Sequence, residues 1–296
     1  MGPIARDNLQ PNGIATMTVS FHKFPPSGEL SPFVRFYYSV DSPSPRPETV
    51  SNHPLGGVDL VFSLRGATCF RTEGHTSVMD GVFLLPLQER PFETTFDPDL
   101  HHFGIAFRAE GFTRLFDFPI GGLANCGVVI GSELSELETL RGALFRQESG
   151  QDRARIVDQY LGDRLHTVPE RNPAALEVVR QIRGRGGNVS LDELCREVRA
   201  SARTVQRWSR DLLGVSPKTY SQIVRFNTFL HRLRRDPVRP PLDIALSLGY
   251  YDQSHLTAEV RRFTGHPPGR FFRRPDGVSE FFGGNRTSLA VDSEDR

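Results

Sequence analysis

The C-terminal third of the chain contains one helix-turn-helix pattern twice, and the two copies lie 51 residues apart. The offset maps helix starts, apolar anchors and turn residues onto one another: Leu191 onto Leu242, Asp192 onto Asp243, Val205 onto Leu256, Leu212 onto Phe263, Gly214 onto Gly265 and Pro217 onto Pro268. Repeated anchors with diverging residues between them are typical of a recurring structural unit. Two such units can place two helices in successive major-groove segments of one DNA duplex.

Local signals predict helices throughout residues 172–275. Asn172-Pro173 starts a helix, because Asn can cap it and Pro suits the first helical position. Ser190, with Glu193 three residues later, predicts a capping box. The spacing of apolar, capping and stop residues predicts helices over 174–185, 191–198, 202–213, 217–235, 242–248, 252–264 and 268–273. We therefore expect the first unit at about 190–213 and the second at about 241–264, with a long helix joining them.

The charge of the chain is unevenly distributed along its length. Residues 173–275 contain 19 Lys and Arg against 9 Asp and Glu, whereas residues 1–172 contain 15 against 21. A basic block beside an acidic one indicates a polyanion-binding module joined to a part that avoids polyanions. The alternative is a basic face that is merely solvated.

The region before the repeat has a different pattern. Short apolar runs rich in Val and Phe, bounded by turn residues, predict β-strands over 34–40, 58–64, 82–85, 92–96 and 103–107. Strands at this spacing suggest an antiparallel barrel or sandwich. A short helix is expected over 112–116. Amphipathic helices over 133–147 and 152–165 are expected to pack together or against a second protomer.

These patterns define an α+β multidomain chain. We expect a flexible leader over 1–20, a β-barrel domain with accessory helices over 21–166, a linker over 167–171, an all-α domain over 172–275 and a disordered tail over 276–296. No apolar run approaches the roughly 20 residues of a membrane span, and the first ten residues lack a signal-peptide core. We therefore expect a cytoplasmic protein without a membrane partner.

Other classes of function find little support in the sequence. Cys69, Cys126 and Cys195 are odd in number and widely spaced, which argues against a disulfide framework and a zinc site. No nucleophile elbow, phosphate loop or catalytic carboxylate pair is recognisable, so we expect neither an enzyme nor a cofactor. Two alternatives stay open: an enzyme on a small barrel with an attached DNA-binding module, and an architectural protein that binds DNA without choice of sequence.

The basic block resembles the DNA-binding domain of the AraC/XylS family of bacterial transcriptional regulators over about 100 residues. The resemblance is carried by Ile244-Ala245, by the run from Gly249 through Tyr250-Tyr251-Asp252-Gln253-Ser254-His255 to Leu256, and by the run from Arg261 through Arg262-Phe263-Thr264-Gly265 to Pro268 and Phe271. More weakly, residues 53–62 and 103–108 resemble the cupin-like barrels that precede this domain in many such regulators. The resemblance implies a sequence-specific regulator that binds promoter DNA. It also implies RNA polymerase as a partner if the protein is an activator, and a small-molecule effector and a homodimer as further options.

In the first unit, Arg203, Gln206, Arg207 and Arg210 share one helix face. By the family's pattern, the first three stand where base-contacting residues are expected. Arg can bind guanine and Gln can bind adenine through two hydrogen bonds, each worth roughly 1–3 kcal/mol of discrimination. The alternative is a face that is solvated or contacts only phosphates.

In the second unit, the corresponding base-reading set is Gln253, Ser254, His255 and Thr257. Family members often carry a large polar or basic residue at the position of Ala258, so this departure predicts weaker base readout. His255 either contacts DNA or holds the turn together. Phosphate contacts are expected from Arg210, Lys218, Arg225, Arg261 and Arg262.

Four histidines and two charged residues are the candidate site residues of the N-terminal domain. His53, His75, His101 and His102 do not form a recognisable ligand set, and adjacent residues of a strand point to opposite faces, so no metal is expected. Asp59 and Arg108, at apolar strands, are candidate effector contacts. Either they pair with each other, which we favour, or Arg108 holds an anionic effector.

Overall fold

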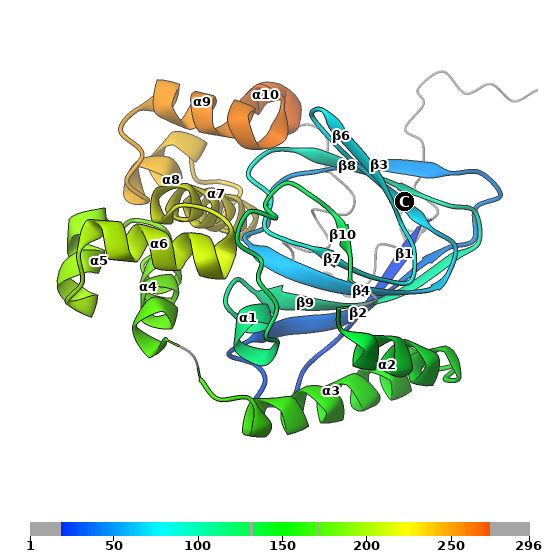
Figure 1. The fold of residues 1–296 in the computed structure, drawn as a ribbon. Helices are drawn as coiled ribbons and strands as arrows, with labels where there is room; N and C mark the ends of the chain where they lie inside the picture. The colour runs from blue at the N-terminus through cyan, green and yellow to red at the C-terminus, as the bar shows by residue number, and fades with distance from the viewer. Residues whose placement is uncertain (1–18, 131–132, 171, 273–296) are drawn as a thin grey trace, which may run out of the picture.

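The computed structural model describes residues 19–130, 133–170 and 172–272 (Figure 1). Most of the expected leader, all of the expected tail and the end of the last expected helix at Arg273 lie outside the described residues. The chain forms a β-rich N-terminal domain with three helices on one side and an all-helical C-terminal domain.

Two antiparallel sheets face each other in the N-terminal domain. The six-stranded sheet has the order β1 (Ser20–Phe24), β2 (Val34–Ser42), β9 (Leu100–Arg108), β4 (Gly57–Arg65), β7 (Val82–Leu85) and β10 (Val128–Val129). The four-stranded sheet has the order β3 (Glu48–Asn52), β8 (Phe92–Phe96), β5 (Thr68–Thr72) and β6 (His75–Met79). Apolar side chains of both sheets, among them Tyr38 and Phe70, form the core between them. The predicted barrel is confirmed.

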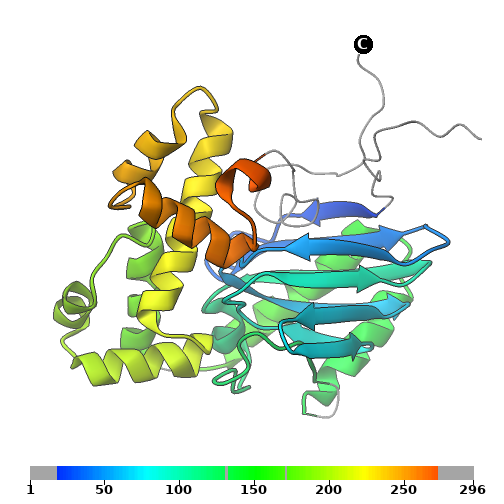
Figure 2. The ribbon, with the colours of Figure 1, turned by 90° about the horizontal axis from the view of Figure 1, so that it is seen from above.

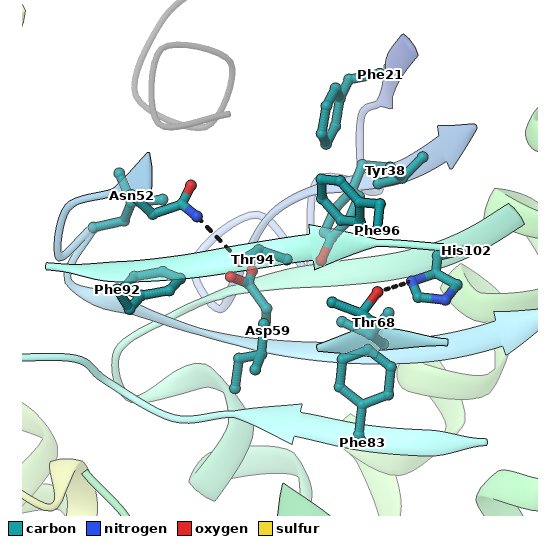
Figure 3. A pocket seen from close by; sticks show the side chains of 14 residues that line it. Phe21, Tyr38, Asn52, Asp59, Thr68, Phe83, Phe92, Thr94, Phe96 and His102 are labelled. Carbon is teal, nitrogen blue, oxygen red and sulfur yellow. Dashed lines mark hydrogen bonds between the residues drawn. The ribbon is translucent and has the colours of Figure 1, made fainter. Parts of the chain in front are cut away.

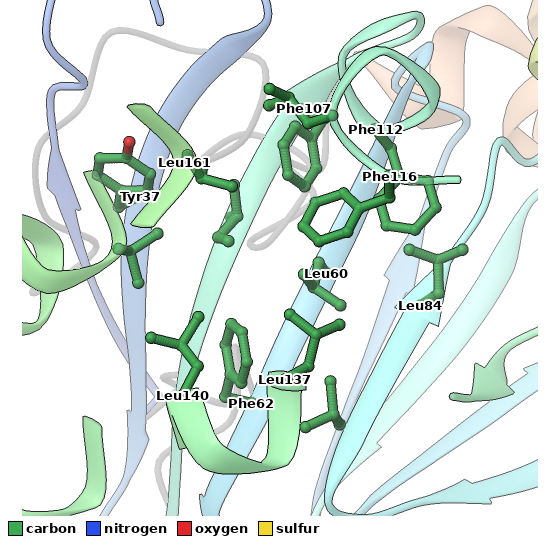
Figure 4. Packing of buried hydrophobic residues seen from close by; sticks show 14 of the residues in the cluster. Tyr37, Leu60, Phe62, Leu84, Phe107, Phe112, Phe116, Leu137, Leu140 and Leu161 are labelled. Atoms are coloured by element: carbon green, nitrogen blue, oxygen red, sulfur yellow. The ribbon is translucent and has the colours of Figure 1, made fainter. Parts of the chain in front are cut away.

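The outer face of the six-stranded sheet is covered by α1 (Gly111–Leu115), α2 (Ser135–Phe145) and α3 (Gly150–Thr167) (Figure 4). Leu60 and Phe62 of β4 pack there against Leu137 and Leu161 of the helices. The two amphipathic helices therefore pack together and on their own sheet, which is the first of the two arrangements expected. Burial of each such apolar side chain contributes roughly 1.5–3 kcal/mol.

The C-terminal domain consists of seven helices in the described residues: α4 (Pro173–Gly184), α5 (Leu191–Val198), α6 (Ala202–Leu213), α7 (Pro217–Arg235), α8 (Pro241–Ser247), α9 (Gln253–Thr264) and α10 (Pro268–Phe271). The predicted repeat is confirmed, because α6 and α9 both have 12 residues and their bounds differ by 51. Each ends at a glycine in the left-handed region, Gly214 at φ +75° and Gly265 at φ +73°. Other residues rarely adopt this conformation, which explains the glycines.

The capping box at the start of α5 is confirmed. Ser190 Oγ accepts a hydrogen bond from the Glu193 amide at 3.2 Å, and Glu193 Oε2 accepts one from the Ser190 amide at 2.7 Å. We expect Ser190→Ala to lower the free energy of unfolding by about 1 kcal/mol in urea denaturation, because an amide at the helix start loses its acceptor. Ser254→Ala, at an exposed position inside α9, is the control. Equal losses in the two variants would contradict the capping role.

The two domains pack against each other (Figure 2). Asn227 of α7 donates a hydrogen bond to the Pro54 carbonyl at 2.9 Å, and Arg183 of α4 pairs with the buried Glu110 at 2.9 Å. The buried ring of His53 lies edge-on to Phe226 and Phe271, at 5.7 and 5.8 Å between centroids. Burial, with a smaller effect from the charge of Arg234, lowers the pKa of His53 to about 3, so this ring is neutral at physiological pH.

Candidate nucleic-acid interface

A groove runs between the two helix-turn-helix units and is lined by side chains from both. Five residues predicted to contact DNA line it: Gln206 and Arg210 of α6, Lys218 and Arg225 of α7, and His255 of α9. The groove is also lined by Asn188, Ser190 and Gln222, which were not among the predicted DNA contacts. Since α5, α6, α7 and α9 all contribute, the groove exists only when the two units are held side by side.

The exposed face of α6 carries the predicted base-reading set. Arg203 and Arg207 are exposed and Gln206 is half-buried, whereas Val205 on the opposite face is buried. Within the described part of the chain, neither Arg203 nor Arg207 has an ion pair, so both guanidinium groups are available to a ligand. The helix starts at Ser201, whose hydroxyl accepts a hydrogen bond from the Thr204 amide at 3.2 Å.

The corresponding face of α9 is less basic at its start. Gln253, Ser254 and Ala258 are exposed, and Thr257 is half-buried. Asp252 caps the helix, with its Oδ1 accepting a hydrogen bond from the His255 amide at 2.7 Å. Leu256, Val260 and Phe263 are buried.

His255 is held by neighbours within the protein. Its Nδ1 is 3.3 Å from the Tyr251 amide, which donates to it, and its Nε2 is 3.4 Å from Glu259 Oε2. Of the two roles that the sequence left open, these contacts support the one of holding the turn. The ring still lines the groove.

Arg225 forms the most buried ion pair of the C-terminal domain in the described residues. Its Nη2 lies 2.6 Å from Oε2 of Glu259, whose side chain is only 2% exposed. Tyr250 donates a hydrogen bond to the other Glu259 oxygen at 3.1 Å, and the Arg225 guanidinium stacks over the Tyr250 ring at 4.6 Å. Burial disfavours the charged form of Arg225, but the hydrogen bond to Glu259 and the negative charge of that carboxylate together raise the pKa of Arg225. The structure thus gives Arg225 an ion pair inside the protein, and its expected phosphate contact stays a prediction.

The remaining predicted phosphate contacts lie at two places. Lys218 is exposed in the first turn of α7. Arg261 and Arg262, at the end of α9, line a cleft whose other wall comes from Glu73, Glu89 and Arg90 of the N-terminal domain. Arg262 donates a hydrogen bond to the Gln222 side chain at 2.7 Å, which links it to the groove.

The favoured pairing of Asp59 with Arg108 is wrong. Asp59 lies 4.0 Å from Arg35 of β2, and Arg108 Nε donates a hydrogen bond to the Ser31 carbonyl at 2.9 Å. The strand register places Arg108 opposite Gly57. Because Gly57 has no side chain, the guanidinium of Arg35 can extend past it to Asp59. No local sequence signal predicts this contact.

Between the two sheets lies a small, partly open cavity of about 60 Å³ (Figure 3). Its lining is mostly apolar and includes Phe83 and Leu55, with Asp59, Thr94 and His102 as polar members. Asn52 of β3 donates a hydrogen bond at 3.1 Å to the hydroxyl of Thr94 on the neighbouring strand β8. Burial lowers the pKa of His102 to about 4, so the ring is neutral at physiological pH.

The described residues offer no metal site of three or more His, Cys, Asp or Glu side chains. His101 contacts Asp41, whereas His102 points to the opposite face and lies in the barrel, as the strand geometry predicts. Within the same residues, none of the helices has the length and apolar character needed to cross a membrane.

Comparisons with known proteins give two family matches. The helix-turn-helix domain family matches residues 194–274, and a domain of unknown function (DUF6597) matches residues 22–128. A comparison with curated proteins found no match. The first match lies within the all-helical C-terminal domain and the second within the β-rich N-terminal domain, so both agree with the division of the structure into two domains.

Three solved structures are similar in fold. ToxT from Vibrio cholerae O395 has 10% identity and a TM-score of 0.41, with 89% of this chain and 96% of that chain covered. The AraC-like transcriptional activator CuxR has 12% identity and a TM-score of 0.30, with 79% and 92% covered. A cupin domain of a transcriptional regulator from Enterobacter cloacae has 12% identity and a TM-score of 0.22, with 31% and 96% covered.

The identities and TM-scores of these structures are low. The domain families of this chain are therefore assigned from the two family matches and from the residues described above. The helix-turn-helix match contains α6, α9 and most of the residues that line the groove. The chain therefore has a C-terminal domain of the AraC-type helix-turn-helix family, which follows a β-rich N-terminal domain that matches a domain family of unknown function.

Proposed function

We propose that this regulator is sequence-specific and reads two adjacent major-groove segments, with α6 in one and α9 in the other. The observation that carries the proposal is the groove lined by both units, beside which the exposed faces of α6 and α9 present Arg203, Arg207 and Gln253. Guanidinium and carboxamide groups are suited to hydrogen bonds with base edges, which supports a choice of sequence over uniform binding.

The two helices are expected to contribute unequally. In α6 two arginines and a glutamine share the exposed face, whereas α9 offers a glutamine, a serine and the methyl group of Ala258. A methyl group can contact only the thymine methyl. We therefore assign most of the discrimination between sequences to the segment that α6 reads.

We also propose that the N-terminal domain conveys a signal to the DNA-binding domain, because it contacts the ends of both recognition helices. A Cβ on Gly214, after α6, would lie 3.1 Å from the Ile120 carbonyl oxygen. One on Gly265, after α9, would lie 3.7 Å from Pro91. A ligand that binds two arrangements of this junction unequally would change DNA affinity. An effector and a homodimer fit this proposal, as does RNA polymerase as partner of an activator.

A gel-shift series with genomic fragments of the host at one fixed salt concentration tests the proposal. Specific binding predicts that a few fragments are retained at protein concentrations at which most are free. Equal retention of all fragments would identify an architectural protein instead. Absence of retention would contradict DNA binding by this chain.

Phosphate contacts should appear in the salt dependence of binding. Each neutralised phosphate releases counterions, so the slope of log affinity against log salt reports their number. We expect Lys218→Ala to reduce this slope by about 1 while the preferred fragments stay the same. Arg155→Ala, at an exposed site on α3, should leave the slope unchanged. If the two variants have the same slope, Lys218 does not contact phosphate.

A further inference from the structure

Tyr251 lies in the turn between α8 and α9, directly before the residue that caps α9. Its side chain is 87% exposed. Within the described residues its backbone amide has a hydrogen-bond partner, but its hydroxyl group has none and its ring contacts no other ring. The phenol group is therefore available to a ligand.

The usual structural role of a large side chain at this position does not apply to Tyr251. An apolar residue directly before a helix cap often packs against the fourth residue of the helix and so fixes the direction in which the chain enters it. In α9 that partner would be Leu256, which is 4% exposed. The exposure of Tyr251 excludes such packing, so stabilisation of the helix start does not account for this residue.

The 51-residue offset shows how the two units differ at this place. It maps Tyr251 onto Ala200, which is half-buried and packs against the core of the C-terminal domain. It also maps the three long side chains on the exposed face of α6 onto shorter ones of α9: Arg203 onto Ser254, Gln206 onto Thr257 and Arg207 onto Ala258. The second unit thus has short side chains where the first has long ones, and a long side chain where the first has only a methyl group.

Contacts on both sides hold the turn that carries Tyr251. The preceding Tyr250 is 3% exposed and donates a hydrogen bond to Glu259 at 3.1 Å. The Tyr251 amide donates one at 3.3 Å to Nδ1 of His255, whose side chain lines the groove between the two units. The backbone of Tyr251 is therefore fixed beside the groove. A tyrosine has only two side-chain torsions, so ordering it against a ligand costs little entropy.

The position of Tyr251 shows which part of a duplex it would meet. In helix-turn-helix proteins the N-terminal residues of the recognition helix contact base edges, and in α9 these begin at Gln253. Tyr251 precedes the cap and therefore lies at the rim of the groove segment, where the phosphates are. The exposed carboxylate of Asp252 repels a phosphate there, so a neighbouring hydrogen-bond donor is needed. Tyrosine hydroxyl groups are among the donors that bind phosphate oxygens in DNA complexes.

We propose that Tyr251 is a DNA contact of the second unit, and that its hydroxyl donates a hydrogen bond to a phosphate oxygen beside the major-groove segment that α9 reads. The contact compensates for the short side chains of α9 and fixes the position of that helix on the duplex. This inference rests on the proposed function, because it adds a residue to the same interface.

Gel-shift titration of the full chain with a retained genomic fragment tests the contact. Tyr251→Phe removes only the hydroxyl group, and the affinity should fall about ten-fold or more. Because the phenol group is neutral, its contact releases no counterions, so the slope of log affinity against log salt should stay unchanged, in contrast to Lys218→Ala. The order of preferred fragments should also stay the same, because a phosphate contact does not select a base. Unchanged affinity of Tyr251→Phe, or a changed order of fragments, overturns the proposal.

The matched control is Phe145→Ala, which removes an exposed aromatic ring from α2 of the N-terminal domain. It should bind DNA like the original chain, and an equal loss of affinity in both variants would contradict a specific role of Tyr251. Urea denaturation of Tyr251→Phe should match that of the original chain, so that the lost affinity reports the contact and not the fold. If the original chain and Tyr251→Phe retain the same fragments equally well, only this inference fails. If the original chain retains no fragment, the proposed function fails as well.

Discussion

Arg225→Ala is expected to lower the free energy of unfolding of the C-terminal domain by about 3–5 kcal/mol. The change leaves the Glu259 carboxylate, which is 2% exposed, without its cation at 2.6 Å. The Tyr250 hydroxyl and, at 3.4 Å, Nε2 of His255 remain near Glu259, but these contacts do not replace the guanidinium beside a buried charge. Urea denaturation followed by circular dichroism measures the loss.

The double variant Arg225→Met with Glu259→Leu is the control for this prediction. It removes both charges and keeps apolar volume, so it should recover most of the stability that the single change loses. If Arg225→Ala costs less than about 1 kcal/mol, the ion pair is not a structural element. Arg225 would then again be a candidate for a phosphate contact.

Arg207→Ala is expected to relax the choice of base at one position of the binding site. An arginine that binds guanine through two hydrogen bonds contributes roughly 1–3 kcal/mol of discrimination, which corresponds to about 5- to 150-fold in relative affinity. The side chain is exposed on α6, so its removal should leave the fold intact. Competition binding with a library of single-base changes in a retained fragment measures the effect.

Arg262→Ala is the matched comparison for Arg207→Ala. It removes the same charge from α9, where the side chain is linked to Gln222, and should weaken binding to all sequences alike. If both variants reduce affinity uniformly, the face of α6 does not read bases. The assignment of the reading helix would then be wrong.

Much of the helical domain could be predicted because its signals are local. The bounds of α5 and α6 agree with the sequence expectation residue for residue, since Ser190 and Ser201 start them and Gly214 ends the second. The starts and ends of α7 and α9 follow from the same kind of capping and stop residues. A cap acts over three or four residues, so no knowledge of distant packing is needed.

Burial explains most of the difference between the strands that were predicted and those that were missed; β8, which is half-exposed and was predicted over 92–96, is an exception. β2, β4 and β9 are buried on both faces, between the helices and the second sheet, so they appear as continuous apolar runs and were predicted. β3, β5 and β6 expose one face and alternate with polar residues, and they were missed, as were β1 and β10. β1 begins at Ser20, so the structured part starts within the expected leader.

The contacts of the candidate sites could not be predicted, because they join residues far apart in sequence. Arg225 and Glu259 are 34 positions apart, and in the sequence nothing distinguishes Arg225 from the other basic residues of its helix. Arg35 reaches Asp59 only because Gly57 leaves space beside it. The double glycine at 56–57, next to a buried tyrosine from the other domain, is the sequence feature that could have indicated the junction.

The central claim is that α6 and α9 occupy successive major-groove segments of one duplex. Dimethyl sulfate footprinting on a retained fragment tests it most directly, because the reagent modifies guanine N7 in the major groove, the atom that an arginine covers. The account predicts two protected segments on one face of the duplex, about 10 base pairs apart, with Arg207→Ala removing protection in only one of them. Protection confined to a single segment, or unchanged in both segments by Arg207→Ala, would contradict it.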